Sequence, residues 1–127
     1  MYEKNEEYIV TCIDDTDLNS GVVKIDDMVV FVPNLLIGEK AKIKIVKVNK
    51  KYAFGIITQL LKPSINRQEL TCEVAKTCGG CQLQHMKYAY QLDYKYKHVK
   101  KLFEDIEVKS ILGMDSPWYY RNKAQFP

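Results

Sequence analysis

Three cysteines in one short stretch are the residues of this sequence best suited to chemistry. Cys72, Cys78 and Cys81 have the spacing C-x5-C-x2-C, with a Gly-Gly pair between the last two. The C-x2-C element lets two thiolates converge on one metal, and glycines permit positive φ and close approach of backbone amides to sulfur. Cys72 can supply a third thiolate. The spacing therefore predicts a metal or metal–sulfur site with Cys72, Cys78 and Cys81 as ligands.

The spacing leaves the fourth ligand open. A zinc site of three cysteines and one histidine would use His85, which follows Cys81 by four residues, or His98 further along the chain. An iron–sulfur cluster normally takes four cysteines, and the remaining one, Cys12, lies in a predicted strand, where free cysteines are usually buried. Thiol redox chemistry and cysteines without a function are the other interpretations of the loop.

Five short strands are predicted ahead of this loop, at residues 8–13, 22–25, 28–32, 39–48 and 52–61. Asp26 and Asp27 separate two of them as a tight hairpin. In the fourth strand Ala41, Ile43 and Ile45 alternate with lysines, so we expect the apolar side chains to face inward. The alternation slips at Val46, which predicts a bulge.

The predicted order of elements indicates two domains. Five strands without a helical pattern favour an all-β, OB-like five-stranded antiparallel barrel over residues 1–62, because closure removes exposed edges. Pro63 marks the expected boundary. Residues 63–127 are predicted to form a small α+β segment: the cysteine loop, a helix over about 84–106, and a first strand from Trp118. Because this last strand is incomplete, we expect the chain to be part of a longer protein.

The charge is divided along the chain. Residues 1–38 carry eight acidic groups and two lysines, whereas residues 39–127 carry seventeen Lys and Arg against eight Asp and Glu. A basic surface of this kind favours a polyanion such as RNA as partner. The lysines that we expect to contact RNA lie on the fourth predicted strand and the turn after it: Lys40, Lys42, Lys44, Lys47, Lys50 and Lys51. The alternative is a solvated strand face that prevents aggregation.

The predicted helix also combines aromatic and basic residues. Its tyrosines and lysines could form a stacking surface for RNA. Alternatively, the helix packs through its tyrosine rings while the lysines stay in water. The residues concerned are Tyr88, Tyr90, Tyr94 and Tyr96 with Lys87, Lys95 and Lys97. An apolar stripe at spacings of three and four residues is expected to pack: Leu92, Tyr96, Val99, Phe103 and Ile106.

Two classes of protein are excluded by the sequence. No apolar run approaches the roughly 20 residues that a membrane-spanning helix needs. The acidic start of the chain is not followed by the apolar core of a secretory signal. We therefore expect a cytoplasmic protein without a membrane partner, in a compartment where disulfides are disfavoured.

The cysteine motif also carries a family resemblance. The stretch from Cys72 to His85, followed by Tyr120-Arg121-Asn122-Lys123-Ala124-Gln125-Phe126-Pro127, resembles the N-terminal third of the bacterial RNA (uracil-5-)-methyltransferases. The preceding barrel resembles the TRAM domain of the ribosomal-RNA members, through Gly21-Val22-Val23-Lys24-Ile25, Val29-Val30-Phe31-Val32-Pro33 and Gly38-Glu39. Since the transfer-RNA members generally lack this barrel, the resemblance favours ribosomal RNA as substrate.

The resemblance implies an iron–sulfur protein and not a zinc protein. Cys72, Cys78 and Cys81 match three of the four ligands of a four-iron four-sulfur cluster, and the fourth ligand would lie outside this chain. The family transfers a methyl group from S-adenosylmethionine to carbon five of a uridine. The resemblance places the catalytic cysteine and the Rossmann-like domain that binds the methyl donor beyond Pro127. This chain alone, expected to be monomeric, would contain no catalytic residue and would be inactive.

A different class of function remains open at this point. The chain could be a stand-alone RNA-binding module with a structural metal loop and no catalytic role. A thiol-based redox sensor is the third hypothesis.

Overall fold

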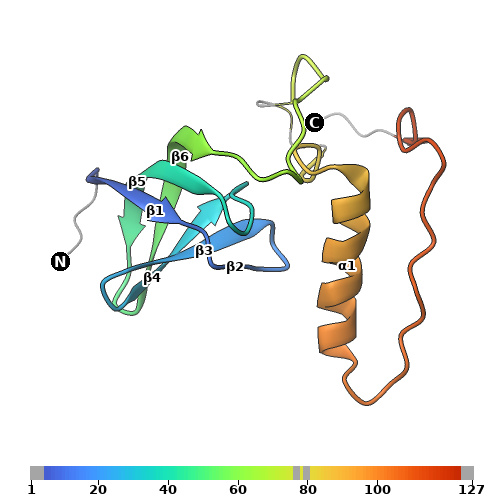
Figure 1. Cartoon of the computed structure of the whole chain (residues 1–127), viewed down its shortest axis with the longest axis horizontal. Helices are drawn as coiled ribbons and strands as arrows, with labels where there is room; N and C mark the ends of the chain where they lie inside the picture. Colours follow the sequence, from blue (N-terminus) through green and yellow to red (C-terminus); the bar gives the residue numbers. More distant parts are fainter. Residues whose placement is uncertain (1–4, 76–77, 79–80, 124–127) are drawn as a thin grey trace. The chain divides into compact units, whose positions relative to one another are not determined.

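The structure of the protein, a computed structural model, describes residues 5–75, 78 and 81–123. The chain forms two compact units, Met1–Lys87 and Tyr88–Pro127. The first unit contains a curled β-sheet and the cysteine loop, and the second contains one helix (Figure 1).

The first unit contains one six-stranded sheet in place of the five strands expected. The strands are β1 (Glu7–Thr11), β2 (Asp14–Asp15), β3 (Ser20–Ile25), β4 (Met28–Pro33), β5 (Lys40–Val48) and β6 (Tyr52–Lys62). The additional strand is β2, which lies where a turn was predicted. Asp14 and Asp15 pair with Val22 and Gly21 of β3, so partners on another strand override the turn preference of the two aspartates.

The strand order explains how the sheet curls. It runs β1-β5-β6-β4-β3-β2, so that consecutive strands β1 and β2 lie at opposite ends. The bend between them is held on both sides: the Cys12 N–H donates to the Glu39 carbonyl at 2.9 Å, and the Ile13 N–H donates to the Val22 carbonyl at 2.9 Å. One bent segment therefore connects both ends of the sheet, as in an OB-like fold. The expected fold class is confirmed in part, with a curled six-stranded sheet in place of a five-stranded barrel.

One strand pair departs from the expected antiparallel arrangement. β4 and β6 are parallel, with Val30 opposite Ala53 and Phe31 opposite Phe54. β5 does not pair with β4 but lies one strand further along the sheet. β6 then folds back from β5 and occupies the position between β5 and β4. Since β5 runs opposite to β4, β6 must run in the same direction as β4.

The core of the sheet follows the alternation in the sequence. Ala41, Ile43 and Ile45 are fully buried, as predicted, and pack with inward residues of the neighbouring strands. The pairing of β5 with β6 shifts between Ile45 and Lys47, which confirms the bulge at Val46. The hairpin at Asp26-Asp27 is also confirmed, since Ile25 pairs with Met28 and Asp26 takes a φ of 53°.

The segment after β6 belongs to the same compact unit as the sheet. The domain boundary expected after residue 62 coincides with the end of β6, but the unit continues to Lys87. An isolated antiparallel bridge joins Arg67 to Met86, and the Gln68 N–H donates to the His85 carbonyl at 2.9 Å. These contacts close the cysteine loop at its base.

The second unit contains helix α1 (Tyr88–Leu102), which is shorter than the predicted helix of residues 84–106. Its N-terminal limit is set by Met86, which is held in the bridge to Arg67. A segment after the helix returns along it: the Tyr96 hydroxyl donates to the Val108 carbonyl at 3.1 Å, and the Met114 N–H donates to the Tyr88 hydroxyl at 2.8 Å.

Two expectations for the second unit are wrong in the described residues. No strand forms from Trp118 to Lys123, where no partner strand is available for pairing; residues 124–127 lie outside the described part. The predicted apolar stripe is largely exposed at Val99, Phe103 and Ile106, whereas the one buried residue of α1 is Tyr94. In the part of the chain that the structure describes, no helix is long and apolar enough to span a membrane.

Candidate nucleic-acid interface

The lysines of β5 lie on the outer face of the sheet. Because Ala41, Ile43 and Ile45 point into the core, the alternating Lys40, Lys42 and Lys44 point outward, and all three are exposed or half-exposed. Residues two apart on a strand are separated by about 6.6 Å. The strand thus presents a row of ammonium groups on its outer face.

The row continues beyond the bulge. Lys47, Lys50 and Lys51 are exposed, and Lys47 is opposite Phe54 in the register of β5 and β6. All six predicted lysines therefore lie on one strand and its hairpin. Lys40 and Lys47 are seven residues apart on the strand, a span of about 23 Å, so the lysines could follow a polyanion but could not share one phosphate.

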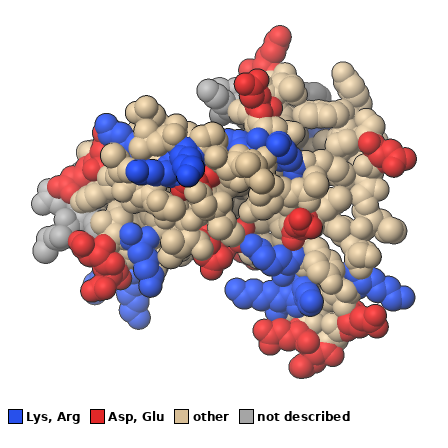
Figure 2. All heavy atoms as spheres, viewed as in Figure 1, with Lys and Arg blue, Asp and Glu red and all other residues tan. Residues whose placement is uncertain are grey.

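Acidic groups partly neutralise this surface. The Lys42 Nζ lies 3.0 Å from the Glu7 Oε2, and both side chains are well exposed. Glu7 is also the register partner of Lys44. Figure 2 shows basic and acidic side chains interspersed on the face that it presents. The sequence did not reveal this carboxylate, because the pairing of β1 with β5 brings together residues far apart in the chain.

Three aromatic residues lie on the outer face beside the lysines. Phe31, Tyr52 and Phe54 belong to the parallel strands β4 and β6, and their ring centroids are 5.5–5.9 Å apart. Sequence reasoning did not select them. The available signal was alternation, since each lies next to a buried inward residue.

The three cysteines of the predicted metal site are exposed thiols in one loop. The Ala75 N–H donates to the Cys72 carbonyl at 3.2 Å, and the Cys78 N–H donates to the Val74 carbonyl at 2.8 Å. Thiolates are suitable ligands for an iron–sulfur cluster. Among the described residues, however, no three Cys, His, Asp or Glu side chains are gathered as metal binding requires. The glycine pair lies outside the described residues.

The fourth cysteine is separate from this loop, as predicted. Cys12 is 2% exposed and belongs to the core of the sheet. Its thiol donates to the Asp14 carbonyl at 3.1 Å, and burial raises the pKa of the thiol. A Cβ added at Gly21 would lie 2.8 Å from the Cys12 Sγ, so glycine is required for this close approach. Cys12 is therefore a packing residue.

The two histidines considered as zinc ligands lie in different environments. His85 is 6% exposed, and its Nε2 has no hydrogen-bond partner among the described residues. Burial, followed by the positive charge of Arg67, lowers the pKa of His85 to about 4, so the imidazole is neutral near pH 7. His98 lies on α1, with its ring centroid 4.6 Å from that of Tyr94.

A buried ion pair ties the segment before the cysteines to the sheet. Glu39 is fully buried and accepts hydrogen bonds from the backbone N–H groups of Leu36 at 2.7 Å and Ser64 at 3.0 Å. Arg67 donates to the same carboxylate. Burial alone would raise the pKa of Glu39, but the hydrogen bonds, led by that from Arg67, outweigh it and lower this pKa.

The other side of the cysteine loop is also attached to the sheet. The Asn19 side-chain amide donates to the Gln82 carbonyl at 2.6 Å and to the Asn34 side chain at 2.9 Å. Gln82 directly follows Cys81. The sheet therefore holds the loop both before Cys72 and after Cys81.

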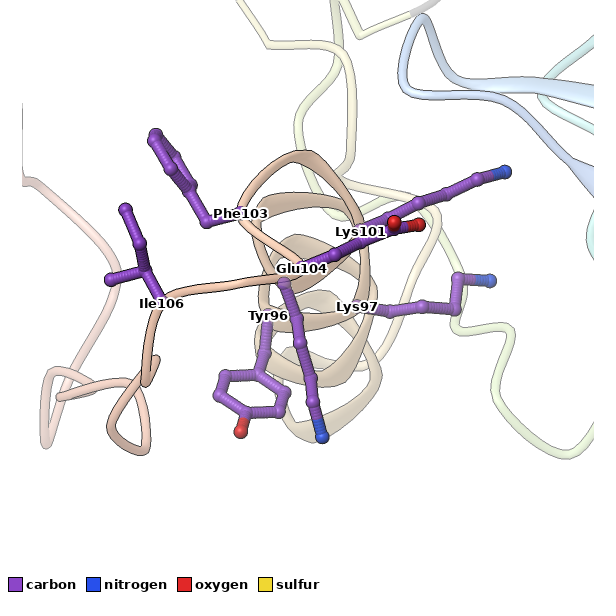
Figure 3. A pocket seen from close by; sticks show the side chains of 7 residues that line it. Tyr96, Lys97, Lys101, Phe103, Glu104 and Ile106 are labelled. Carbon is purple, nitrogen blue, oxygen red and sulfur yellow. The ribbon is translucent and has the colours of Figure 1, made fainter.

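The tyrosines of α1 serve mainly in packing. Tyr94 is buried, and the hydroxyls of Tyr88 and Tyr96 bond to the returning segment. A shallow hollow of about 490 Å³ lies at the end of the helix, lined in part by Tyr96, Lys97 and Phe103. In Figure 3, Phe103 points to one side of the helix and Lys97 to another. The side chains do not converge on a ligand, so we place the candidate interface on the sheet.

The fold defined by this sheet corresponds to a known domain. Residues 4–58 match the model of the TRAM domain family, a range that runs from before β1 into β6. The sheet of the first unit is therefore similar to a TRAM domain, in agreement with the expected resemblance.

The whole chain is homologous to proteins named RNA methyltransferases. It is 45% identical over 130 residues to an uncharacterized RNA methyltransferase of Halalkalibacterium halodurans, covering 98% of this chain and 28% of that protein. It is 42% identical over 132 residues to one of Listeria monocytogenes, covering 100% of this chain and 29% of that protein. The chain thus spans less than a third of the length of these curated relatives.

A solved structure is similar over much of the chain. The crystal structure of Pyrococcus abyssi tRNA (uracil-54, C5)-methyltransferase in complex with S-adenosyl-L-homocysteine aligns with a TM-score of 0.50 and 26% sequence identity. The alignment covers 75% of this chain and 21% of that chain. The residues after the sheet make up only about half of the chain, so an alignment over 75% of it must include part of the sheet. This relative therefore departs from the expectation that transfer-RNA members lack the barrel.

Proposed function

We propose that this chain is the RNA-binding part of an RNA (uracil-5-)-methyltransferase that uses S-adenosylmethionine. The observation that carries the proposal is homology to proteins named RNA methyltransferases over 98% of the chain. The choice of carbon five of uracil is supported by the name of the solved relative. The methyl donor is supported by the S-adenosyl-L-homocysteine in that relative, which is what remains of S-adenosylmethionine after methyl transfer.

The contribution of this chain is to hold RNA. The outward lysines of β5 and its hairpin would contact phosphates without selecting a sequence, because ammonium groups recognise backbone charge and not base edges. The chemistry itself would be performed by parts of the enzyme outside this chain. We accordingly propose that the chain alone binds RNA as a monomer in the cytoplasm and transfers no methyl group.

The cysteine loop is proposed to hold three corners of a four-iron four-sulfur cluster. Cys72, Cys78 and Cys81 would be the ligands, with a fourth from outside the chain. Three exposed thiols in one loop, attached to the sheet at both ends by Arg67 and Asn19, support this proposal. When bound, the cluster would connect the loop to the segment that supplies the fourth thiolate.

Ribosomal RNA is the first proposed substrate, from the resemblance of the barrel to that of the ribosomal-RNA enzymes. Transfer RNA is the second candidate. It is favoured by the solved relative, which is named a transfer-RNA enzyme and aligns with three quarters of the chain.

Loss of hydrogen from uracil provides the test of the reaction. Methylation at carbon five replaces the hydrogen there, so the complete enzyme should release tritium from RNA labelled at carbon five of its uridines. Release should match methyl incorporation from labelled S-adenosylmethionine. Separate reactions with unmodified ribosomal and transfer RNA identify the substrate. Methyl incorporation without tritium release would reject carbon five, and no incorporation into either RNA would reject the methyltransferase.

A further inference from the structure

The three outer aromatic residues form one continuous patch. Phe31 and Phe54 are register partners on the parallel strands β4 and β6, and Tyr52 precedes Phe54 by two residues on the same face. Tyr52 meets both phenylalanine rings edge-on, with interplanar angles of 68° and 88°. The three rings therefore pack against one another on two paired strands.

This patch is separate from the hydrophobic core. Val30, Val32 and Ala53, the chain neighbours of the three aromatics, are fully buried and point inward. Phe31 and Phe54 are partly exposed, and Tyr52 is 38% exposed. The buried core consists of aliphatic side chains and Cys12, so it does not contain these three rings. A cluster of aromatic side chains that is exposed to water is typical of a binding site.

Lysines lie on both sides of the patch. On one side, Lys47 of β5 is opposite Phe54, and Lys44 is opposite Ile56. On the other side, Lys24 of β3 is opposite Val29, which in turn is opposite Tyr52. The aromatic rings thus lie between positive charges contributed by two strands. The acidic pair Asp26 and Asp27 lies in the hairpin that connects β3 to β4.

We propose that Phe31, Tyr52 and Phe54 form a stacking platform for the bases of single-stranded RNA, with Lys24, Lys44 and Lys47 contacting the flanking phosphates. This inference rests on the proposed function and adds to it the form of RNA that is bound. Aromatic rings stack on any base, and lysines track the backbone, which is how single strands are held without sequence readout. A duplex hides its base faces and cannot use the platform.

Aromatic grooves also bind proline-rich peptides, so the occupant must be argued. The lysines on both sides favour a polyanion over a neutral peptide. In a single strand of RNA the bases are flanked by phosphates, and on this sheet the rings are flanked by lysines.

The experiment measures binding of the 127-residue chain to three labelled RNAs of equal length by fluorescence anisotropy. The RNAs are a uridine oligonucleotide, the same backbone with abasic positions, and a duplex. We expect the uridine strand to bind more tightly than both others. Tyr52→Ala should weaken that binding on the order of tenfold, while Tyr52→Phe should retain it. Tyr119→Ala, at an exposed tyrosine outside the sheet, is the matched control and should bind as the parent does.

The outcomes separate this inference from the proposed function. If the parent chain binds the uridine and abasic strands equally and Tyr52→Ala has no effect, the platform is rejected while RNA binding stands. If the chain binds none of the three RNAs, its proposed function is rejected, and the platform, which rests on that function, is rejected with it. Binding of a proline-rich peptide that RNA does not displace would also reject the platform.

A second measurement covers the case in which Tyr52→Ala does not fold, as judged by circular dichroism. Irradiation of the parent chain with an oligonucleotide that contains 4-thiouridine should crosslink Phe31, Tyr52 or Phe54. Crosslinks confined to residues of α1 would overturn the proposal.

Discussion

Arg67 donates two hydrogen bonds to the carboxylate of Glu39, from Nε to Oε2 at 2.6 Å and from Nη2 to Oε1 at 2.8 Å. Glu39 directly precedes β5, and Arg67 lies between the sheet and the cysteine loop. Two parallel N–H donors match a carboxylate in both geometry and charge. This pair therefore joins the segment that leads to the cysteines to the strand that carries the lysines.

Replacing the charge of Glu39 should destabilise the first unit. Glu39→Gln keeps the shape of the side chain but leaves the guanidinium of Arg67 without its carboxylate, which we expect to cost about 2 kcal/mol in the free energy of unfolding. Urea unfolding followed by circular dichroism measures this cost. Glu7→Gln is the matched control, since its partner Lys42 is exposed, and a change below about 0.5 kcal/mol is expected. Equal effects of the two changes would contradict the role of burial.

The buried imidazole of His85 predicts a dependence of stability on pH. Its pKa is about 4 in the folded protein, against about 6.5 in an unfolded chain. Between these values the unfolded state binds a proton that the folded state does not, so the free energy of unfolding should fall as the pH drops. The contribution is full above pH 6.5 and decreases by roughly 2 kcal/mol between pH 7 and 5.

The slope of stability against pH is the quantity to compare among variants. His85→Gln should flatten the slope between pH 7 and 5, whereas His98→Gln should retain it. The lowered pKa of Glu39 acts below this window, because stability from a carboxylate is lost only as the pH falls through its folded pKa. An unchanged slope in His85→Gln would show that another group is responsible.

Reversing charge on the outer row of β5 should weaken RNA binding. Lys42→Glu with Lys44→Glu removes two phosphate contacts, so affinity should decrease and its dependence on salt should become flatter. Titrations at several salt concentrations measure both. Lys95→Glu with Lys109→Glu, at exposed lysines of the second unit, is the control of equal charge change. If the control reduces binding as much as the β5 variant, net charge and not the sheet surface is decisive.

The metal proposal predicts different results for two cysteine substitutions in the complete enzyme. Cys78→Ser should abolish iron and acid-labile sulfide in protein purified without oxygen, while the sheet stays folded because it has its own core. Cys12→Ala should retain the iron and lower stability, because it leaves a small cavity in that core. Stoichiometric zinc in the parent enzyme would reject the cluster.

The strands could be predicted where the alternation of apolar and polar residues along the chain determines which side chains are buried. The alternation at Ala41, Ile43 and Ile45 fixes which face of β5 is buried, and the slip at Val46 predicts the bulge. The parallel pairing of β4 with β6 has no such local signal, because it depends on β6 occupying the position between β5 and β4 in the sheet. The same reason accounts for β2, which becomes a strand only through its partners in β3.

The candidate site was predicted in part. The outward direction of Lys40, Lys42 and Lys44 was predicted, because alternation with buried residues sends them to the outer face. The carboxylate of Glu7 beside Lys42 and the pair of Glu39 with Arg67 were missed, since both join residues far apart in the sequence. The aromatic platform was missed because Phe31, Tyr52 and Phe54 are typical strand residues, and only the pairing of β4 with β6 shows that they meet.

The bent segment that connects β1 to β2 has a consequence for the order of folding during synthesis on the ribosome. Its two parts join both ends of the sheet, so residues 7–11 need partners at 40–44, and those partners in turn need β6. The β3–β4 hairpin can form from neighbouring residues, whereas residues 7–11 cannot pair until β5 and β6 have left the ribosome. β1 is thus among the last strands of the sheet to pair, although it precedes all the others in the sequence.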